Sequence, residues 1–508
     1  QFLGFKVNSG EYKMMGLAPY GEPVYADLIL KHLVKLKEDG SISINQDYFS
    51  YLDGTVMTNN KFENLFGGPS RKPESKITKR EMDIASSIQQ VTEKIIFNMA
   101  NYTKKLTGEE NLCLSGGVAL NCVANGQLIN SNLFKDIWIQ PAAGDAGSSL
   151  GCAYDAYFSY FKNERILQED NLSLQSGSLL GPSWTNSEIK SFLDSADINY
   201  DFYKNDNEKN KILAEKIKEG KVAGIFLGRT EFGPRALGSR SIIGDPRNKD
   251  MQARLNLKIK YRESFRPFAP AILIEETDRY FKLKKESPYM MLVAPVNNEK
   301  RLPLTKNKTE DMLKIVKETR SEIPAVTHVD YSARIQTVDK KLNHKFYEII
   351  KEFEKQTGCP LVINTSFNVR GEPIVNSPVD AYRCFMNTDM DILVIENFVL
   401  YKNKQNNLNF KQWKIRKKNI LEKKDKKIFL SKELTRVYSK AKKINTNDDF
   451  PTEGWKSYRN NNLNQIFEIP KALDEENYDP VIMSEEIVKY WSNKNFAKET
   501  KDIIKNLL

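Results

Sequence analysis

Four arginines stand among glycines and prolines between Gly228 and Arg247. The glycines and prolines interrupt any continuous helix over this segment. Glycine lets backbone N–H groups come close to a ligand, and the arginine side chain binds phosphate or carboxylate oxygens through paired hydrogen bonds. Apolar side chains are interleaved with the charges, which a purely solvated basic loop does not need. The segment therefore predicts a polyanion site, most simply for phosphates, with a solvated loop as the alternative. Its arginines are Arg229, Arg235, Arg240 and Arg247.

Three later segments add basic and polar side chains that could complete such a site. Two of them, around 258–266 and 328–334, contain lysine, arginine and histidine. The third is a polar turn after an expected strand, where amide and hydroxyl groups can hydrogen-bond a small polar group. Several negative charges need several fixed cations, so the number of arginines favours phosphates. A lone histidine is more often a core or surface residue than a catalytic one. The residues concerned are Lys258, Lys260, Arg262, Arg266, His328, Arg334, Asn364, Ser366 and Asn368.

The first part of the chain carries two glycine-rich turns, each between an expected strand and an expected helix. The turn at 115–117 would present backbone N–H groups and a helix amino terminus to an anion. In the turn at 144–147, Asp145 is a carboxylate at the end of a strand, which suits a metal or a nucleotide phosphate with its Mg²⁺. An ordinary strand-to-helix turn and a helix cap are the respective alternatives. Lys13, near Gly and Pro, could reach a phosphate or lie in a surface loop.

These residues depend on strands and helices that the hydrophobic pattern locates. A helix is expected over 80–106, where Ile84, Ile88 and Val91 recur at helical spacing. The pattern divides the chain into an α/β region over 1–179, a second region over 180–402 and an extension over 403–508. Further helices are expected at 119–130, 150–161, from Asn186 and near 484–508, and strands at 111–114, 137–140, 222–227, 269–274, 289–295, 360–364 and 392–395.

Length and charge bound the class of protein. A chain of 508 residues exceeds a single core and predicts two or three domains. The net charge of +11 is concentrated in 403–443, which holds 15 Lys/Arg against 3 Asp/Glu, so the remainder sums to about −1. Nucleic-acid binding is therefore not expected. No apolar run approaches the ~20 residues of a membrane helix, and five sparse cysteines favour reduced thiols. The expectation is a cytoplasmic protein without a membrane partner.

Seven segments, in this order along the chain, resemble those of the NodU/CmcH-type O-carbamoyltransferase family. They span Glu11 to about Leu400, which is most of the chain. Their order makes the match specific, whereas any single segment would be weak. The segments are EYKMMGLAPYG, LSGGVALNCVANG, PAAGDAGSSLG, GRTEFGPRALGSRSIIGDPR, YRESFRPFAP, HVDYSARIQTV and NTSFNVRGEPIV.

The resemblance implies an α/β fold with an α+β second domain. A partial actin/sugar-kinase-like ATPase domain would be followed by a YrdC-like domain. In such enzymes the YrdC-like domain forms carbamoyl adenylate from carbamoyl phosphate and ATP, the latter with Mg²⁺. The first domain then transfers the carbamoyl group to a hydroxyl of a small molecule, often a sugar, assisted by divalent iron. Phosphate, pyrophosphate and AMP are released.

On matching positions, the resemblance also implies roles for individual residues. Five arginines would bind the phosphates of carbamoyl phosphate and ATP, and three polar residues would shape the pocket for the carbamoyl group and the nucleotide. The arginines are Arg229, Arg235, Arg262, Arg266 and Arg334; the polar residues are Asn364, Ser366 and Asn368; His328 and Lys13 are further catalytic candidates, Lys258 a cofactor-binding one; Gly116, Gly117 and Asn121 would contact the adenylate, and Asp145 would ligate the metal.

One departure concerns the metal. The family's first domain begins with a segment whose histidine pair completes the metal site, and this chain has no such pair and starts with Gln1. The expectation is therefore a chain that lacks the amino-terminal half of that domain, makes the adenylate and fails in transfer. Two alternatives stay open: carbamoyl modification of tRNA, which the near-neutral charge outside the tail disfavours, and a non-catalytic nucleotide-binding protein. Hydrogenase-maturation enzymes of similar chemistry carry paired-Cys zinc motifs, which this sequence lacks.

Overall fold

A computed structural model describes residues 1–52, 54–165, 175–303 and 311–406. The chain divides into two compact units, and the first carries every candidate site residue named above. The boundary expected near residue 179 falls inside this first unit. Most of the second unit, including the helix expected near 484–508, lies outside the described residues. The first unit comprises Gln1–Ala156, Glu164–Asp194 and Asn199–Gln405; the second comprises Tyr157–Asn163, Ser195–Ile198 and Asn406–Leu508.

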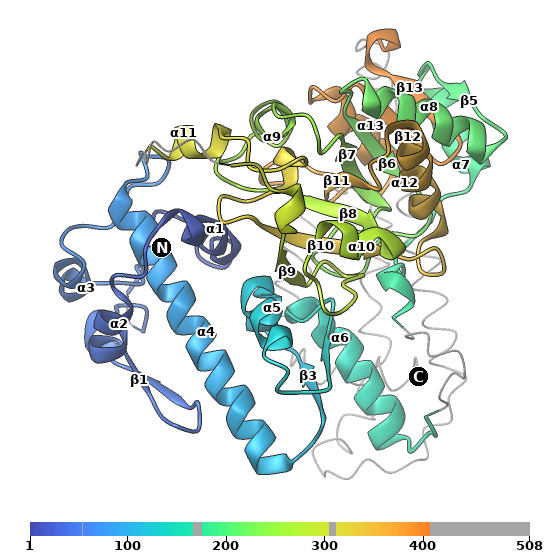
Figure 1. Ribbon diagram of the computed structural model, residues 1–508. Coiled ribbons are helices and arrows are strands. Elements are labelled where there is room, and N and C mark those ends of the chain that lie inside the picture. Colours follow the sequence, from blue (N-terminus) through green and yellow to red (C-terminus); the bar gives the residue numbers. More distant parts are fainter. Residues whose placement is uncertain (53, 166–174, 304–310, 407–508) are drawn as a thin grey trace, which may run out of the picture. The chain divides into compact units, whose positions relative to one another are not determined.

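The long helix α4 (Lys79–Thr107) is the scaffold of the amino-terminal part of the first unit (Figure 1). At its start, Glu81 accepts hydrogen bonds from the backbone N–H of Thr78 (2.8 Å) and from its hydroxyl (2.6 Å). The helix ends where Gly108 takes a left-handed φ of +71°. The prediction of a helix over 80–106 is confirmed. The shorter elements around it are α1 (Glu11–Leu17), η1 (Ala18–Tyr20), α2 (Ala26–His32), β1 (Val34–Leu36), β2 (Ile42–Ile44), η2 (Gln46–Tyr48) and α3 (Asn60–Leu65).

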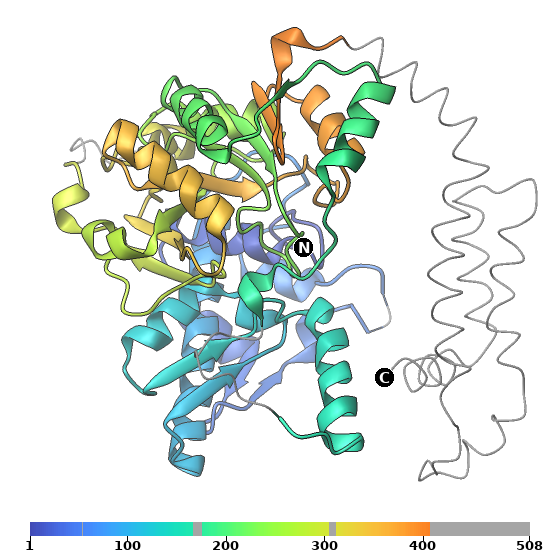
Figure 2. The same ribbon diagram turned by 90° about the vertical axis from the view of Figure 1, so that its right-hand side faces the viewer.

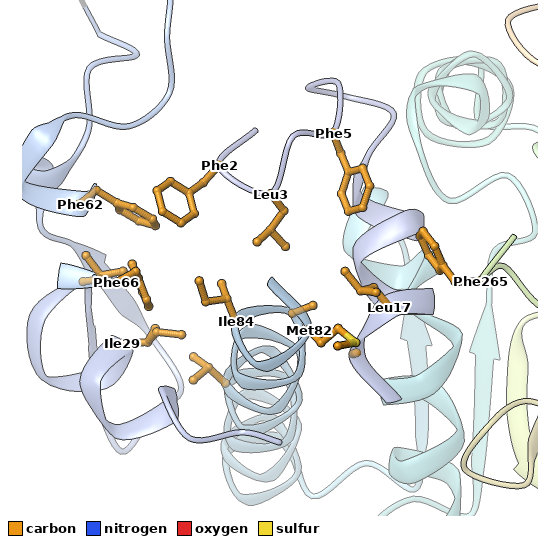
Figure 3. Close-up of a cluster of buried hydrophobic side chains, with 14 residues drawn as sticks. Phe2, Leu3, Phe5, Leu17, Ile29, Phe62, Phe66, Met82, Ile84 and Phe265 are labelled. Carbon is orange, nitrogen blue, oxygen red and sulfur yellow. The ribbon is translucent and has the colours of Figure 1, made fainter. Parts of the chain in front are cut away.

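Aromatic and aliphatic side chains from these elements form a core at the start of α4 (Figure 3). The rings of Phe2, Phe62 and Phe66 contact one another: the centroid of Phe62 lies 4.9 Å from that of Phe2 and 4.8 Å from that of Phe66, and Phe2 and Phe66 are 5.9 Å apart. Aromatic pairs at this separation stabilise a core beyond the area that they bury. This core therefore holds the first residues of the chain against α3 and α4.

Phe265 enters the same core from far along the sequence (Figure 3). Its ring lies 6.3 Å from that of Phe5, and its carbonyl oxygen accepts a 2.9 Å hydrogen bond from the hydroxyl of Tyr20. Only 1% of Phe265 is exposed. Because Phe265 belongs to the basic segment that begins at Lys258, this contact fixes that segment against α1 and η1.

A small parallel sheet brings the two glycine-rich turns together. β3 (Asn111–Leu114) pairs with β4 (Asp136–Ile139), and the N–H of Gly116 donates to the carbonyl of Ala143 over 2.8 Å. The next helix, α6 (Asp145–Tyr154), starts at Asp145 rather than at the expected Leu150. Its early start brings the backbone at Gly147 close to Ala142, where a Cβ would lie 2.1 Å from the Ala142 carbonyl oxygen. The helix expected at 119–130 is divided into η3 (Gly117–Leu120) and α5 (Cys122–Asn130), and α6 continues as the π-helical η4 (Asp155–Tyr160).

The remaining strands form a nine-stranded mixed sheet in the order β5-β13-β12-β6-β7-β11-β8-β10-β9 (Figures 1 and 2). β12 runs parallel to β6 and β10 parallel to β8, whereas the other neighbours are antiparallel. The strands predicted from the apolar runs are confirmed, but β5, β10, β13 and β7, which lies within the arginine segment, were not expected. The bounds are β5 (Asp201–Phe202), β6 (Ala223–Phe226), β7 (Arg240–Gly244), β8 (Ala269–Leu273), β9 (Leu292–Pro295), β10 (Ser332–Val338), β11 (Leu361–Ser366), β12 (Ile392–Ile395) and β13 (Phe398–Tyr401).

Helices cover this sheet. α12 (His344–Thr357) packs against α8 (Asp206–Lys218) and lies on β8 and β11, while α13 (Pro378–Met386) packs on β6 and β12. Among the described residues, no helix combines the length and the apolar character needed to cross a membrane. The other helices are η5 (Ser176–Ser178), α7 (Asn186–Ser195), α9 (Met251–Arg254), η6 (Leu255–Ile259), η7 (Ile274–Glu276), α10 (Thr277–Tyr280), η8 (Asn298–Lys300), α11 (Met312–Lys317), η9 (Pro324–Val326) and η10 (Lys402–Lys404).

Candidate functional site

Four arginine side chains from three segments converge in the first unit, and they are called the arginine cluster below. Arg235 lies in the loop between β6 and β7, Arg262 and Arg266 lie between η6 and β8, and Arg334 is on β10. The positive charges of Arg334 and Arg266 act on both Arg235 and Arg262, so the guanidinium groups are close neighbours. Like charges in one place repel each other, and burial strengthens the repulsion. The cluster is therefore suited to an anionic ligand.

The cluster is short of hydrogen-bond acceptors. Burial, together with Arg334, lowers the pKa of Arg235 to about 9, and burial holds the pKa of Arg262 well below its usual value. Arg235 as a whole is half-buried, yet its Nε is fully buried and has no hydrogen-bond partner. Arg262 is held by the side-chain oxygen of Asn256 (2.6 Å) and lies over the Phe268 ring. A guanidinium stays protonated at neutral pH, so buried positive charge faces the site.

Glu263 is a carboxylate that faces the cluster. Its Oε1 accepts a 2.7 Å hydrogen bond from Nζ of Lys13 on α1, and its Oε2 lies 3.8 Å from Nη1 of Arg266. Burial raises the pKa of Glu263, but the hydrogen bond from Lys13 and the charge of Arg266 outweigh burial, so the pKa is lowered and the group is ionised. Nη2 of Arg370 also lies 3.7 Å from Oε1 of Glu263. One carboxylate shared among three cations leaves the rest of the cluster uncompensated.

Two further contacts hold α1 against the cluster. The guanidinium of Arg266 lies over the ring of Tyr12, 4.7 Å from its centroid. Nε2 of His328 lies 2.9 Å from the carbonyl oxygen of Gly16. Because a carbonyl oxygen only accepts, Nε2 carries the proton, and burial lowers the pKa of His328, which favours the neutral ring. His328 was a catalytic candidate in the sequence. In the structure its Nε2 bonds the Gly16 carbonyl and so positions α1.

Lys260 holds the polar turn that the sequence analysis singled out. Its Nζ donates to the carbonyl oxygens of Ser366 and Asn368, each over 2.7 Å, and to Oδ1 of Asn368 over 2.5 Å. Only 4% of Lys260 is exposed. The next residue, Tyr261, has a left-handed φ of +49°, which is costly for a side chain of this size. This conformation reverses the chain between Lys260 and Arg262, so both cations can turn inward.

Asn364 is almost completely buried on β11, with 1% of its surface exposed. Its side-chain nitrogen donates to the carbonyl oxygen of Ala236 (3.0 Å) and to Oε1 of Gln336 (2.6 Å). Its Oδ1 has no hydrogen-bond partner. Asn364 therefore contacts the residue that follows Arg235 in the chain, and it keeps a buried acceptor free.

Two arginines of the opening segment serve the fold. Arg240 is fully buried over the ring of Phe226, 3.5 Å from its centroid, and donates to backbone carbonyls, including that of Leu227 (2.9 Å). Arg247 forms a two-point ion pair with Asp245, with distances of 2.9 Å and 2.7 Å. Their partners leave these two side chains little capacity for a ligand. Of the four arginines between Gly228 and Arg247, only Arg235 joins the cluster.

Arg229 and Lys258 also lie apart from the cluster. Arg229 is exposed and donates to the carbonyl oxygens of Gly181 (2.9 Å) and Leu180 (2.6 Å). The side chain of Lys258 is exposed on η6, whereas Lys260, two residues later, is buried. A π-helical turn at this position brings Lys260 rather than Lys258 to the polar turn.

The glycine-rich turns present an open surface. No atom lies within 4 Å of a Cβ built at Gly116 or Gly117, and both are exposed. Asn121 caps α5 and exchanges two amide hydrogen bonds with Gln89, each of 3.1 Å. Asp145 is the exposed first residue of α6. The turns can therefore receive a ligand, while Asn121 is committed to its cap and to α4.

The arginine segment runs beside the second of these turns. Gly233 has a φ of +131°, and a Cβ there would lie 3.4 Å from both the Pro141 carbonyl oxygen and the Ala142 Cβ. On α5, Gly126 lies so close to the Val293 carbonyl oxygen that a Cβ would be 2.1 Å from it. Gly233 is needed for its positive φ, and Gly126 because no Cβ fits there. They bring the amino-terminal turns and the nine-stranded sheet into direct contact.

The metal implied for Asp145 does not find a complete ligand set in the part of the chain that the structure describes. No group of three or more His, Cys, Asp or Glu side chains is placed there to hold a metal ion. An iron site needs several such ligands around one point. Asp145 alone does not fit such a site.

A cavity of about 1540 Å³ lies next to the cluster, and Lys13, Glu263 and Arg370 are among the residues that line it. The arginines of the cluster do not line it. Two of the arginines that line it are already paired: Arg370 bonds Glu74, and Arg80 bonds Glu81 over 2.8 Å. Paired charges attract phosphates less than unpaired ones, so the cluster rather than this cavity is the candidate anion site.

Two residues of the site, Glu263 and Tyr12, were not among the residues predicted for it. Lys260 was predicted only as one of several basic residues that could complete the site, without its contact to the polar turn. Their partners are distant in sequence: Lys13 for Glu263, and Ser366 for Lys260. One signal was present in the sequence, since a glutamate within the basic run YRESFRP is out of keeping with its neighbours.

Comparison with known proteins finds similarity over two stretches of the chain, one near its start and one that covers most of the nine-stranded sheet. The family description "Carbamoyltransferase N-terminus" matches residues 1–154, and "Carbamoyltransferase C-terminus" matches residues 214–402. Uncharacterized protein sll1178 of Synechocystis is 56% identical over 80% of this chain and 66% of its own length. Nodulation protein NolNO of Sinorhizobium fredii is 35% identical over 79% of this chain and 54% of its own. Nodulation protein NolO of Bradyrhizobium diazoefficiens is 36% identical over 77% and 66%.

The chain spans between about half and two thirds of the length of these curated relatives. Among solved structures, the full-length HypF crystal structure in its phosphate- and nucleotide-bound form matches 54% of this chain and 36% of its own. Its sequence identity is 13% and the TM-score is 0.26, which is too low to establish a shared arrangement. The relationship to carbamoyltransferases therefore rests on the sequence matches.

Proposed function

Because this chain belongs to the NodU/CmcH-type carbamoyltransferase family, we propose that its arginine cluster binds carbamoyl phosphate and ATP and that it forms carbamoyl adenylate. The observation that carries the proposal is the convergence of four half-buried arginines, Arg235, Arg262, Arg266 and Arg334, whose charge Glu263 offsets only in part. Two phosphate esters together bring several negative charges. A cluster of this kind is the counterpart that such a load requires.

The residues of the cluster would act on charge that develops at phosphorus. Carbamoyl phosphate loses its phosphate to water, and the carbamate oxygen then attacks the α-phosphorus of ATP, which displaces pyrophosphate. Fixed guanidinium groups stabilise the oxygens around phosphorus as the bond to the leaving group lengthens. Burial strengthens this effect, because water does not screen the charges. Mg²⁺ would accompany ATP as its counter-ion.

The polar turn would frame the ligand. Lys260 fixes the carbonyl oxygens of Ser366 and Asn368, which leaves the side-chain nitrogen of Asn368 and the Ser366 hydroxyl as part of a rigid wall. Rigid walls lower the entropy cost of holding two reactants together. Lys13 and His328 would contribute indirectly, by holding α1 beside the cluster. Arg229 and Lys258, which lie apart, would contribute least.

The proposal extends to the domains. Residues 1–179 would be the carboxy-terminal part of an actin/sugar-kinase-like transfer domain, and residues 180–402 a YrdC-like domain that forms the adenylate. The glycine-rich turns with Gly116, Gly117 and Asp145 would face the adenylate and the acceptor, a hydroxyl-bearing small molecule or sugar. The extension over 403–508 has no assigned role.

Carbamoyl-phosphate-dependent exchange of pyrophosphate into ATP tests the activation step. The chain should catalyse exchange with ATP, Mg²⁺ and carbamoyl phosphate together, and none when carbamoyl phosphate is omitted. Exchange that is independent of carbamoyl phosphate, or the absence of exchange, would contradict the proposal.

Measuring the release of AMP with different acceptors shows which class of acceptor the chain uses. If AMP release from the chain rises with tRNA and not with hydroxyl-bearing sugars, the protein modifies RNA instead. If exchange occurs and neither acceptor raises AMP release, activation is separate from transfer in this chain. Binding of ATP without exchange would identify a non-catalytic nucleotide-binding protein.

A further inference from the structure

Glu231 gathers backbone N–H groups from the loop that carries Arg235. Its Oε1 accepts hydrogen bonds from the N–H groups of Leu237 (2.8 Å), Ser239 (2.7 Å) and Arg240 (3.1 Å). Only 8% of Glu231 is exposed. A charged acceptor makes stronger hydrogen bonds than a neutral one, and burial keeps water from replacing them. One carboxylate oxygen therefore ties the end of the loop back to its beginning.

The carbonyl side of the same backbone is held by the sheet and by the residue that caps α12. The carbonyl oxygen of Ala236 accepts a 3.0 Å hydrogen bond from the side-chain nitrogen of Asn364. The carbonyl oxygen of Leu237 accepts from the side-chain nitrogens of Gln336 (3.0 Å) and of the capping residue Asn343 (3.2 Å). The first two residues that follow the cluster arginine in this loop are thus fixed through their carbonyl groups.

The loop depends on such bonds because glycines lie on both sides of Arg235. Gly233 has a φ of +131° and Gly238 a φ of +108°. A Cβ at Gly238 would lie 2.2 Å from the ring of Phe346, so no larger residue fits there. Glycine also gives the backbone more conformational freedom than other residues do. The hydrogen bonds to the loop therefore restrain a backbone that its own residues leave free.

The direction of the Arg235 side chain depends on this backbone. Its buried Nε has no hydrogen-bond partner, and the charges of Arg334 and Arg266 repel it. By contrast, Nε of Arg262 is fixed by a 2.6 Å hydrogen bond to Asn256. Repulsion drives a side chain away from like charges unless the structure holds it in place. For Arg235, that restraint comes from the backbone from which it extends.

We propose that Glu231 is a positioning residue of the arginine cluster: it fixes the backbone that follows Arg235 and so keeps the Arg235 guanidinium beside the other arginines, against their repulsion. This inference rests on the proposed function of the cluster. Glu231 does not contact the ligand and acts only through Arg235. Loss of its hydrogen bonds should therefore weaken phosphate binding as the loss of Arg235 itself does.

Two variants of Glu231 separate its contacts from its charge. Glu231→Asp keeps the carboxylate, but the side chain is one methylene shorter and its oxygens retreat from the three N–H groups. Glu231→Gln loses the charge and keeps an oxygen that can accept the same hydrogen bonds. In calorimetric titration with inorganic phosphate, Glu231→Asp should bind at least about 10-fold more weakly than the unaltered chain, as Arg235→Ala should. Glu231→Gln should bind nearly as the unaltered chain does.

A double variant shows whether Glu231 acts through Arg235. Glu231→Asp combined with Arg235→Ala should bind phosphate no more weakly than Arg235→Ala alone, because no guanidinium is left to position. A purely structural role would lower the free energy of unfolding without making the two changes non-additive in phosphate affinity. Additive losses would overturn the inference. If Glu231→Asp does not fold, Glu231→Ala replaces it, since its smaller side chain leaves room for water at the N–H groups.

Glu396→Asp is the matched control. Glu396 is 7% exposed, its Oε1 accepts a 2.5 Å hydrogen bond from the Gly228 N–H, and its charge acts on Arg240 as that of Glu231 does. This hydrogen bond lies at the start of the arginine segment, before the loop reaches Arg235. The control should therefore lose stability and keep the phosphate affinity of the unaltered chain.

The remaining outcomes separate this inference from the function on which it rests. If Arg235→Ala weakens phosphate binding and Glu231→Asp does not, or if Glu231→Gln binds as weakly as Glu231→Asp, the inference fails alone. If Glu231→Asp binds phosphate more tightly, the released N–H groups hold the anion themselves, and the inference again fails. If inorganic phosphate does not bind to the unaltered chain, the cluster is not a phosphate site and both proposals fail.

Discussion

Lys13 and Glu263, far apart in the sequence, form an ion pair in which Nζ and Oε1 are 2.7 Å apart. The lysine lies on α1, within the part matched by the amino-terminal family description, and the glutamate lies within the carboxy-terminal match. Both side chains are mostly buried, with 13% and 15% exposed. The pair therefore joins the two matched parts at the edge of the arginine cluster. Because Lys13 holds the Glu263 carboxylate, the pair also determines how far that carboxylate neutralises the cluster when no ligand is bound.

Glu263→Gln should strengthen anion binding. The change removes the carboxylate that lies 3.8 Å from Arg266, so the cluster gains net positive charge. We expect phosphate to bind tighter by about 1 kcal/mol, which is roughly 5-fold. Phosphate titration by calorimetry measures the change.

Lys13→Met should have the opposite effect on the same measurement. Without its lysine, the Glu263 carboxylate is free to pair more closely with Arg266 and to compete with the ligand. Phosphate affinity should fall in Lys13→Met and recover in the double variant, since Glu263 is the intermediary. Equal loss in the single and double variants would mean that Lys13 contacts the anion directly.

Arg235→Ala should abolish carbamoyl-phosphate-dependent ATP–pyrophosphate exchange, with a loss of at least about 100-fold. The guanidinium is buried, its Nε has no partner, and other arginines surround it. Its removal relieves repulsion, so the free energy of unfolding should not fall by as much as a truncation in the core normally costs. Unaltered exchange would remove Arg235 from the site.

Arg247→Gln is the matched control within the same segment. Arg247 is paired with the buried Asp245 and is not part of the cluster. This variant should lose about 1–3 kcal/mol of stability, because it leaves a buried carboxylate without its cation. Its exchange activity per folded molecule should match that of the unaltered chain.

Stability should fall as the pH drops below about 6.5, the ordinary pKa of histidine. Burial lowers the pKa of His328, and Arg320 adds to this, whereas Asp330 and the bond to Gly16 act in the opposite direction. The unfolded chain therefore binds the proton first, so acid favours unfolding, by at most about 1.4 kcal/mol per pH unit. Thermal unfolding between pH 7.5 and 5 measures the slope.

His328→Gln isolates this contribution. Glutamine keeps an N–H donor for the Gly16 carbonyl and does not titrate. The variant should unfold with a shallower dependence on pH than the unaltered chain over the same range. Parallel curves would assign the pH dependence to other groups.

Arg240→Met should destabilise the protein by about 3–5 kcal/mol. The methionine keeps much of the contact with Phe226 but cannot donate to the carbonyl oxygens of Leu227 and Gly228. The nearby charge of Glu231 also loses its counterpart. The midpoint of urea unfolding measures the loss. A change below about 1 kcal/mol would show that the carbonyls find other partners.

The fold could be read from the sequence where the hydrophobic pattern is long or uniform. α4 shows helical periodicity over many turns, and β12 (Ile392–Ile395) is a short apolar run found as predicted. β7 (Arg240–Gly244) was missed because it begins with a charge and ends with glycine. Its arginine is fully buried because it finds Phe226 on the neighbouring strand, a contact that the sequence does not reveal.

The site was predictable as a region and not as a set of contacts. The pattern of arginines located the segment that holds Arg235 and the later runs that hold Arg262, Arg266 and Arg334. It could not tell Arg235, which faces other arginines, from Arg229, which bonds the carbonyls of residues 180 and 181. That difference depends on which distant backbone lies beside each side chain.

The contacts of α1 and η1 differ in what they demand of a partner. The Gly16–His328 and Tyr20–Phe265 bonds each use a backbone carbonyl, which any residue supplies. The Lys13–Glu263 pair uses two side chains and tolerates no independent change. Chimaeras that exchange residues 1–154 between relatives should therefore assemble readily through the first two contacts, and their activity should depend on whether the lysine and the glutamate were inherited together. Recombination within this family is thus constrained at pairs of opposite charges that join the two matched parts, and Lys13–Glu263 is the pair at the arginine cluster.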